Sequence, residues 1–85
     1  MYAQISYEYS KLDNQHEILI SCAENWVWFY LGAMLQKEGI EQSPGFLMIY
    51  PYLGNAKTVK TIEKDDCEEI AEGIVKFIKR KIKIK

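Results

Sequence analysis

The segment Asn25–Leu35, NWVWFYLGAML, constrains the fold of this chain more than any other stretch. Nine of its last ten residues are apolar or aromatic, and the tenth is Gly32. Strong helix formers continue up to Glu38, and Gly39 stands where a left-handed helix stop is expected. The segment therefore predicts one helix that ends at Glu38.

Cap signals at the start of this segment favour a helix over a strand. By composition alone, Trp26–Leu31 would fit a strand equally well. Ser21 and Glu24 stand in the S-x-x-E relation of a capping box, and Asn25 is a rival cap. The agreement of these caps with the stop at the other end supports the helix.

A helix that is apolar all round must be covered on more than one side. Four of its side chains can face a sheet, namely Val27, Leu31, Met34 and Leu35. The others that need cover are Trp26, Phe29, Tyr30 and Ala33. A chain of this length buries only about 60–65% of its unfolded surface, and 48% of its residues are hydrophobic. We therefore expect the second set to contact another subunit; the rival interpretation places the helix deep in a monomeric core.

Alternation with period two predicts a hairpin at the start of the chain. Tyr2–Ser10 and His16–Cys22 each place apolar residues on one face, and the turn-forming residues Lys11–Gln15 separate them. Phe46–Tyr52 is predicted as a third strand whose two faces are both apolar, so that it needs cover on both sides. Lys57–Ile62 is β-branched and charged, which indicates a fourth, more exposed strand.

The C-terminal segment carries the clearest helical pattern of the chain. Its start is predicted to be capped by Asp65 with Glu68 or by Asp66 with Glu69. Apolar residues then recur at spacings of three and four, at Ile70, Ile74, Phe77, Ile78 and Ile82. The tail Lys81–Lys85 alternates instead, so its last residues are predicted either as helix or as strand.

The predicted elements follow one another in the order ββαββα. This order indicates an α+β fold in which a small antiparallel sheet carries two helices packed on one face. Residues 1–85 are expected to form a single domain, because the sequence shows neither an internal repeat nor a linker.

Few residues of the chain suit catalysis or metal binding. His16 is the sole histidine, and six residues of strand would place it about 20 Å from Cys22, beyond the reach of a nucleophile and its base. Cys67 has acidic neighbours that oppose a thiolate. The acidic cluster of Asp65–Glu72 could hold a cation, but helix starts are commonly acidic because of the helix dipole. We therefore expect no enzyme activity, no cofactor and no metal site.

The basic residues gather at the end of the chain, where Ile74–Lys85 holds six of the eleven. Together with two tyrosines of the third strand they predict a ligand or anion site, whose candidate residues are Tyr50, Tyr52, Lys76, Lys79, Arg80 and Lys83. Nucleic-acid binding along the same helix is the alternative. The single arginine and the net charge of -1 weaken that alternative.

These observations favour a small non-enzymatic binding protein. It is expected to act by occupying or sequestering a protein target or a small anionic ligand, as small inhibitors carried by mobile elements and phages do. It is also expected to form a homodimer or a larger homo-oligomer through the aromatic helix. The two lone cysteines, the lack of a signal peptide and the shortness of the apolar runs predict a cytoplasmic protein that does not contact a membrane.

Overall fold

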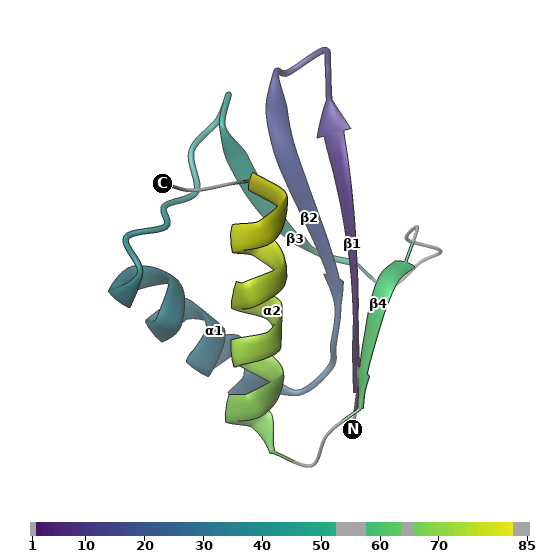
Figure 1. Cartoon of the computed structure of the whole chain (residues 1–85), viewed down its shortest axis with the longest axis vertical. Coiled ribbons are helices and arrows are strands. Elements are labelled where there is room, and N and C mark those ends of the chain that lie inside the picture. Colours follow the sequence, from purple (N-terminus) through teal and green to yellow (C-terminus); the bar gives the residue numbers. More distant parts are fainter. Residues whose placement is uncertain (1, 53–57, 64–65, 83–85) are drawn as a thin grey trace.

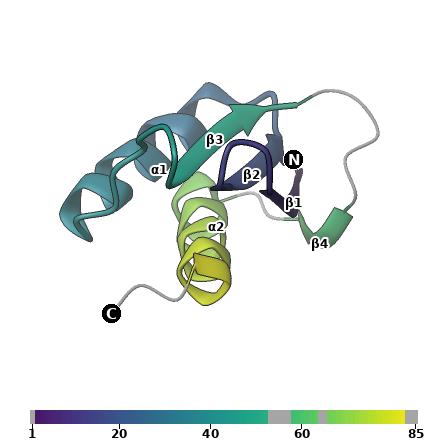
Figure 2. The same ribbon diagram turned by 90° about the horizontal axis from the view of Figure 1, so that it is seen from above.

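The computed structural model of the chain describes residues 2–52, 58–63 and 66–82. Its elements in chain order are β1 (Tyr2–Ser10), β2 (Gln15–Ser21), α1 (Asn25–Lys37), β3 (Leu47–Pro51), β4 (Thr58–Glu63) and α2 (Cys67–Ile82). The strands within the described ranges form one sheet in the order β3-β2-β1-β4, and both helices lie on the same side of it (Figures 1 and 2). The predicted α+β class is confirmed.

The sheet is mixed, so the prediction of an antiparallel sheet is wrong. β1 is antiparallel to both β2 and β4, whereas β2 and β3 run parallel. The reason lies in the connection, because the chain between β2 and β3 passes through α1 and returns in the direction of β2. Parallel neighbours need such a crossover, whereas antiparallel neighbours can be joined by a tight turn.

β3 lies at one edge of the sheet. The apolar composition of Phe46–Tyr52 predicted cover on both faces of this strand, and that prediction is wrong. Phe46 and Tyr50 are exposed. The edge position accounts for Pro51, which has no N–H to donate to a further strand. The free side of the strand is partly satisfied by the preceding loop, because the Gln42 side chain accepts a hydrogen bond from the Ile49 N–H at 2.8 Å. This loop shields an edge that could otherwise pair with another chain.

The predicted first hairpin is confirmed. Its register pairs Ile5 with Ile20 and Tyr7 with Ile18, so apolar residues of both strands share the face toward the helices. The turn closes through Asn14, whose φ of 53° lies in the left-handed region that asparagine tolerates.

The helix α1 begins with a different cap from the predicted one. Glu24 is the N-cap, and its carboxylate accepts a hydrogen bond from the Trp26 N–H at 3.3 Å. The predicted capping box is wrong because Ser21 belongs to β2, where it pairs with Gln4. The predicted stop is confirmed, since Gly39 has a φ of +73°.

The helix α2 supplies most of the core, as its periodicity predicted. The five predicted apolar residues Ile70, Ile74, Phe77, Ile78 and Ile82 are all buried. Of the two predicted caps, Asp66 is the one observed, since its carboxylate accepts the N–H groups of Glu68 and Glu69. Asp65 and the tail from Lys83 to Lys85 lie outside the described residues.

The helix α1 packs chiefly against α2 and has few contacts with the strands. Val27, Leu31 and Leu35 are buried and belong to the same core cluster as the sheet. Trp28 is half-buried, and its indole N–H donates to the carbonyl of Cys22 at 2.9 Å. One side of α1 is thereby fixed, and the other side faces away from the core.

Ser6, in the middle of β1, is fully buried. Its hydroxyl makes no hydrogen bond within the described part of the chain. A buried hydroxyl without a partner loses its hydration and gains no hydrogen bond in return, so the Ser6 side chain lowers the free energy of unfolding.

Candidate functional site

Three aromatic rings of α1 form a cluster on the surface, here called the aromatic cluster (Trp26, Phe29 and Tyr30). The ring centroids of Trp26 and Phe29 are 5.6 Å apart, and those of Phe29 and Tyr30 are 5.7 Å apart, both with edge-to-face geometry. Spacings of three and four residues bring these side chains onto one side of the helix. Trp26 is 59% exposed and Phe29 is 62% exposed, so two of the largest apolar side chains of the protein face solvent.

The placement of the predicted interface residues follows from this geometry. Trp26, Phe29 and Ala33 are exposed, and Tyr30 is half-buried against the core. The rival interpretation, an α1 enclosed within a monomeric core, does not describe this chain. The structure contains no second subunit, so contact with one stays a prediction.

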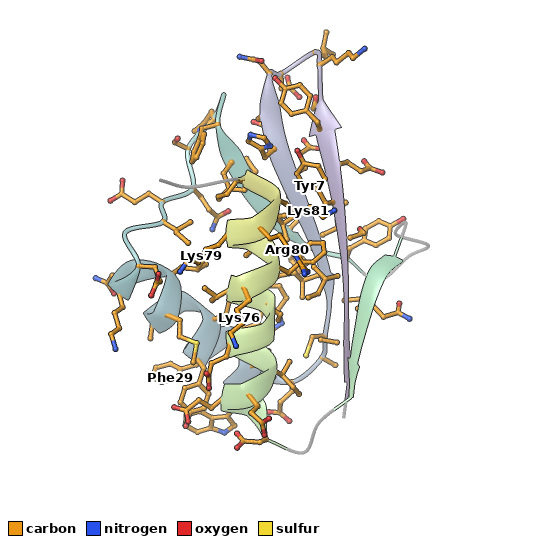
Figure 3. The ribbon with its side chains drawn as sticks, viewed as in Figure 1. Tyr7, Phe29, Lys76, Lys79, Arg80 and Lys81 are labelled. Carbon is orange, nitrogen blue, oxygen red and sulfur yellow. The ribbon has the colours of Figure 1, made fainter. Side chains whose placement is uncertain are left out.

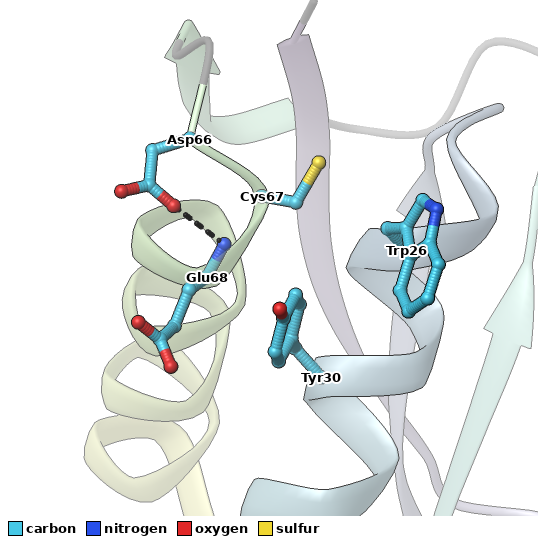
Figure 4. Close-up of a pocket in the computed structure, with 5 residues that line it drawn as sticks. All are labelled: Trp26, Tyr30, Asp66, Cys67 and Glu68. Carbon is cyan, nitrogen blue, oxygen red and sulfur yellow. Dashed lines mark hydrogen bonds between the residues drawn. The ribbon is translucent and has the colours of Figure 1, made fainter.

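A pocket of about 510 Å³ lies between the aromatic cluster and the start of α2 (Figure 4). Trp26 and Tyr30 line one side of it, and Asp66, Cys67 and Glu68 line the other. The two faces differ in chemistry, because one offers aromatic rings and the other offers carboxylates. Rings and carboxylates together favour positively charged groups, which both attract.

Cys67 is the one thiol in this pocket, and its surroundings do not activate it. Burial raises the pKa of the Cys67 thiol above its ordinary value, and the nearby carboxylates of Glu24 and Asp66 raise it further. Nucleophilic cysteines need a lowered pKa, since the thiolate is the reactive species. The pocket therefore suits binding better than covalent catalysis.

A second cavity, of about 390 Å³, continues between α1 and α2 toward the other end of the helices. Glu68 lines both cavities. Lys79 closes the far end (Figure 3). Its ammonium group lies 2.8 Å from the carboxylate of Glu38, the C-cap of α1. The two helices thus form a groove, here called the interhelical groove, that is aromatic and acidic at one end and basic at the other.

The Glu38–Lys79 pair gives a prediction that can be checked directly. The hydrogen bond from Lys79 and its positive charge hold the pKa of Glu38 below its ordinary value. The pair therefore stabilises the fold above the ordinary pKa of a glutamate, and this contribution is lost as the pH falls through the lowered pKa. In Lys79→Gln, NMR titration should show the pKa of Glu38 returning toward the ordinary value. Lys11→Gln, a change in the turn after β1, is the control and should leave Glu38 unchanged.

The residues predicted to form an anion site do not come together. Tyr50 pairs in register with Leu19, on the sheet face turned away from the helices, whereas Lys76, Lys79 and Arg80 are exposed on α2. Tyr52 follows β3 and is half-buried. Lys83 lies outside the described residues. Tyr50 is on that face because successive residues of a strand point to opposite faces and Ile49 faces the core.

Two of the basic residues of α2 also contact aromatic rings of the protein. The Arg80 guanidinium lies 5.8 Å from the Phe77 ring centroid, and the Lys81 ammonium lies 5.7 Å from that of Tyr7 (Figure 3). Burial raises the pKa of the Tyr7 hydroxyl, with a smaller contribution from Tyr9, and this hydroxyl lies 2.7 Å from the His16 Nδ1 atom. His16 thus serves a polar contact within the fold.

Sequence reasoning named most of the α2 residues of the groove but did not place them opposite the aromatic cluster. It assigned Asp66 to helix capping, Glu68 to capping or to an acidic cluster, Glu72 to that cluster, and Lys79 to an anion site. Their place opposite the aromatic cluster depends on how α1 packs against α2, which periodicity does not specify. Only the relative placement of α1 and α2 shows that their exposed residues lie side by side, and the sequence does not give that placement.

The described ranges contain neither a metal-binding cluster nor a helix that could span a membrane. No group of three or more His, Cys, Asp or Glu side chains there is arranged to hold a metal ion. Neither helix in those ranges has the length and apolar character that a membrane span requires.

Comparison of the chain with protein-family models, with curated proteins and with solved structures finds no match.

Proposed function

We propose that this chain is a small non-enzymatic binding protein, which acts by occupying a surface of another protein. The observation that carries the proposal is the exposed aromatic cluster on α1. Exposed Trp and Phe side chains cost free energy in water, at roughly 25 cal/mol for each Å² of apolar surface that stays uncovered. A bound protein surface would recover this cost.

The residue types support a protein partner over a small molecule. Trp and Tyr are enriched at the centre of protein interfaces, where a few residues supply most of the binding energy. The aromatic cluster stands on a rigid helix, so its rings lose little conformational freedom on binding. Carboxylates of Asp66 and Glu68 beside it would favour a basic rim on the partner.

An inhibitory or sequestering role follows from the same features. The pocket beside the aromatic cluster lacks an activated nucleophile, as the raised pKa of Cys67 indicates. A compact domain that offers an exposed aromatic surface can block the surface that it covers without any chemical step. Small inhibitors carried by mobile elements and phages are the class of protein that this mode of action suggests.

The test is a comparison of two variants that each remove exposed apolar surface. Trp26→Ala combined with Phe29→Ala removes the aromatic cluster, whereas Leu12→Ala removes a side chain that is 95% exposed in the turn after β1. A partner is first captured from host extract with the wild-type protein, identified by mass spectrometry and purified. The double variant should bind it at least about thirtyfold more weakly, because even one hot-spot residue contributes about 2 kcal/mol or more. Leu12→Ala should bind like the wild type, and equal binding by both variants would disprove the proposal.

Nucleic-acid binding is a second candidate, carried by the exposure of Lys76, Lys79 and Arg80 on the last turns of α2. It ranks lower because Lys79 already pairs with Glu38, and because acidic residues occupy the first half of the same helix face. Its signature would be an affinity for DNA or RNA that falls steeply with salt. Fluorescence anisotropy with single- and double-stranded probes at low salt tests it, and the absence of binding there would remove it.

A further inference from the structure

The exposed positions of α2 divide sharply by charge. In this helix the exposed residues are Glu68, Glu69, Glu72, Lys76, Lys79 and Arg80. The first three are acidic and the last three are basic, so the two signs are arranged on either side of the level of Ile74. A helix dipole favours acids early and bases late, but it acts within the first and last turns only. Glu72 and Lys76 lie nearer the middle of this helix, where that preference is weak.

This arrangement is complementary to itself when the helix is turned end to end. With a rise of about 1.5 Å per residue, Glu72 lies about 3 Å before Ile74 along the axis and Lys76 about 3 Å after it. A two-fold axis level with Ile74 therefore places Glu72 of one copy beside Lys76 of the other, twice per dimer. At about 100° per residue, the same operation places Glu68 opposite Lys79 and Glu69 opposite Arg80.

The interhelical groove adds a second complementary feature at each end of such a dimer. The aromatic cluster lies beside the acidic start of α2, where Trp26 and Glu68 line the same pocket (Figure 4). In an antiparallel arrangement the basic end of the other α2 would lie over this pocket. Aromatic rings attract lysine and arginine through cation–π contacts, so the pocket and the basic end suit one another.

We propose that the outer face of α2, together with the aromatic end of the interhelical groove, binds a second copy of this chain in an antiparallel two-fold dimer. This inference rests on the proposed function, because it names a second copy as one partner of the aromatic surface. The occupant is a second copy because each exposed acid of α2 lies opposite an exposed base of its own symmetry mate, with Lys79 sharing its charge between Glu68 of that mate and Glu38 of its own chain. A closed two-fold contact also uses the same patch on both subunits, as most homodimers do.

Charge exchange between Glu72 and Lys76 tests the dimer. Glu72→Lys alone would place two lysines together at both contacts, and Lys76→Glu alone would place two glutamates together. Each single variant should raise the dimer dissociation constant at least about tenfold, since apposed like charges strongly disfavour an interface. An equimolar mixture of the two variants should form a heterodimer with both contacts restored. The double variant Glu72→Lys with Lys76→Glu should again form a homodimer.

The mixture separates the dimer from effects within one helix. Glu72 and Lys76 are four residues apart, so each single change also alters a pair within the monomer. Mixing cannot repair a pair inside one chain, whereas it can repair a pair between chains. Circular dichroism should confirm that all variants are folded. Light scattering gives the mass of each sample, and native mass spectrometry identifies the heterodimer.

Three outcomes would overturn the inference. A wild-type chain that is monomeric at millimolar concentration and low salt would do so, and would leave the capture experiment with Trp26 and Phe29 unaffected. A wild-type dimer that ignores the charge changes but dissociates in the Trp26→Ala, Phe29→Ala variant would keep the aromatic surface and reject the α2 pairing. A mixture that stays monomeric while the single variants are folded monomers would reject the antiparallel register.

Discussion

Phe77→Ala is expected to lower the free energy of unfolding by about 3–5 kcal/mol, as truncations of buried phenylalanines do. Phe77 is the largest fully buried side chain of the described core. It lies on α2, which packs against β1, β4 and α1, so the cavity left by its ring would weaken all these contacts. A domain of this length is stable by about 4–13 kcal/mol. The variant should therefore lose a large fraction of its stability.

Urea denaturation followed by circular dichroism measures this loss. Leu12→Ala is the matched control, because it also removes a large apolar side chain, but from a position that is 95% exposed. It should change the midpoint of unfolding very little. If Phe77→Ala unfolded at the same urea concentration as the wild type, the ring could not fill the place that the structure gives it.

Ser6→Ala is expected to raise the free energy of unfolding, by about 1–3 kcal/mol, which is unusual for a substitution in a buried strand. The hydroxyl of Ser6 is buried and makes no hydrogen bond within the described residues. Its removal ends a desolvation cost and takes away only one atom, so the remaining cavity is small. The backbone pairing of Ser6 with Leu19 does not depend on the side chain.

Ser10→Ala is the control for this stabilisation, since it makes the same change on the same strand. The Ser10 hydroxyl accepts a hydrogen bond from the Asp13 N–H at 3.2 Å in the turn between β1 and β2. Its loss should lower stability by about 0.5–1.5 kcal/mol, the net contribution of one hydrogen bond. Thermal unfolding of the three proteins distinguishes the two signs. A melting temperature of Ser6→Ala below that of the wild type would show that the hydroxyl does find a partner.

Periodicity predicted the parts of the fold that depend on neighbouring residues. The alternation of Tyr2–Ser10 determined which face of β1 is apolar, and the spacing from Ile70 to Ile82 determined the buried face of α2. The direction of β3 could not be predicted in this way, because strand pairing depends on the path of the chain through α1. The cap of α1 was also predicted wrongly, because Ser21 pairs with Gln4 in the sheet and is therefore not at the start of the helix.

The sequence predicted the α1 half of the candidate site as one surface, and it named Lys79 of the α2 half without placing it near that surface. The excess of aromatic residues between Trp26 and Tyr30 indicated a surface that needs cover, and the exposure of Trp26 and Phe29 agrees with that reasoning. Its α2 half combines Asp66, Glu68 and Lys79, which follow α1 by about thirty residues or more in the sequence. These residues reach the groove through the packing of the two helices, and no local pattern encodes that packing.

The dependence of α1 on α2 has a consequence for the order of events during synthesis. Domains usually acquire their structure as units, while the ribosome adds about 5–20 residues per second. The stretch from Asn25 to Lys37 leaves the ribosome well before α2, the helix against which it chiefly packs. Until then its indole and phenyl groups have no folded surface to pack against and can contact chaperones or other nascent chains. The pocket between the aromatic cluster and the start of α2 can therefore be complete only after the later helix has been translated.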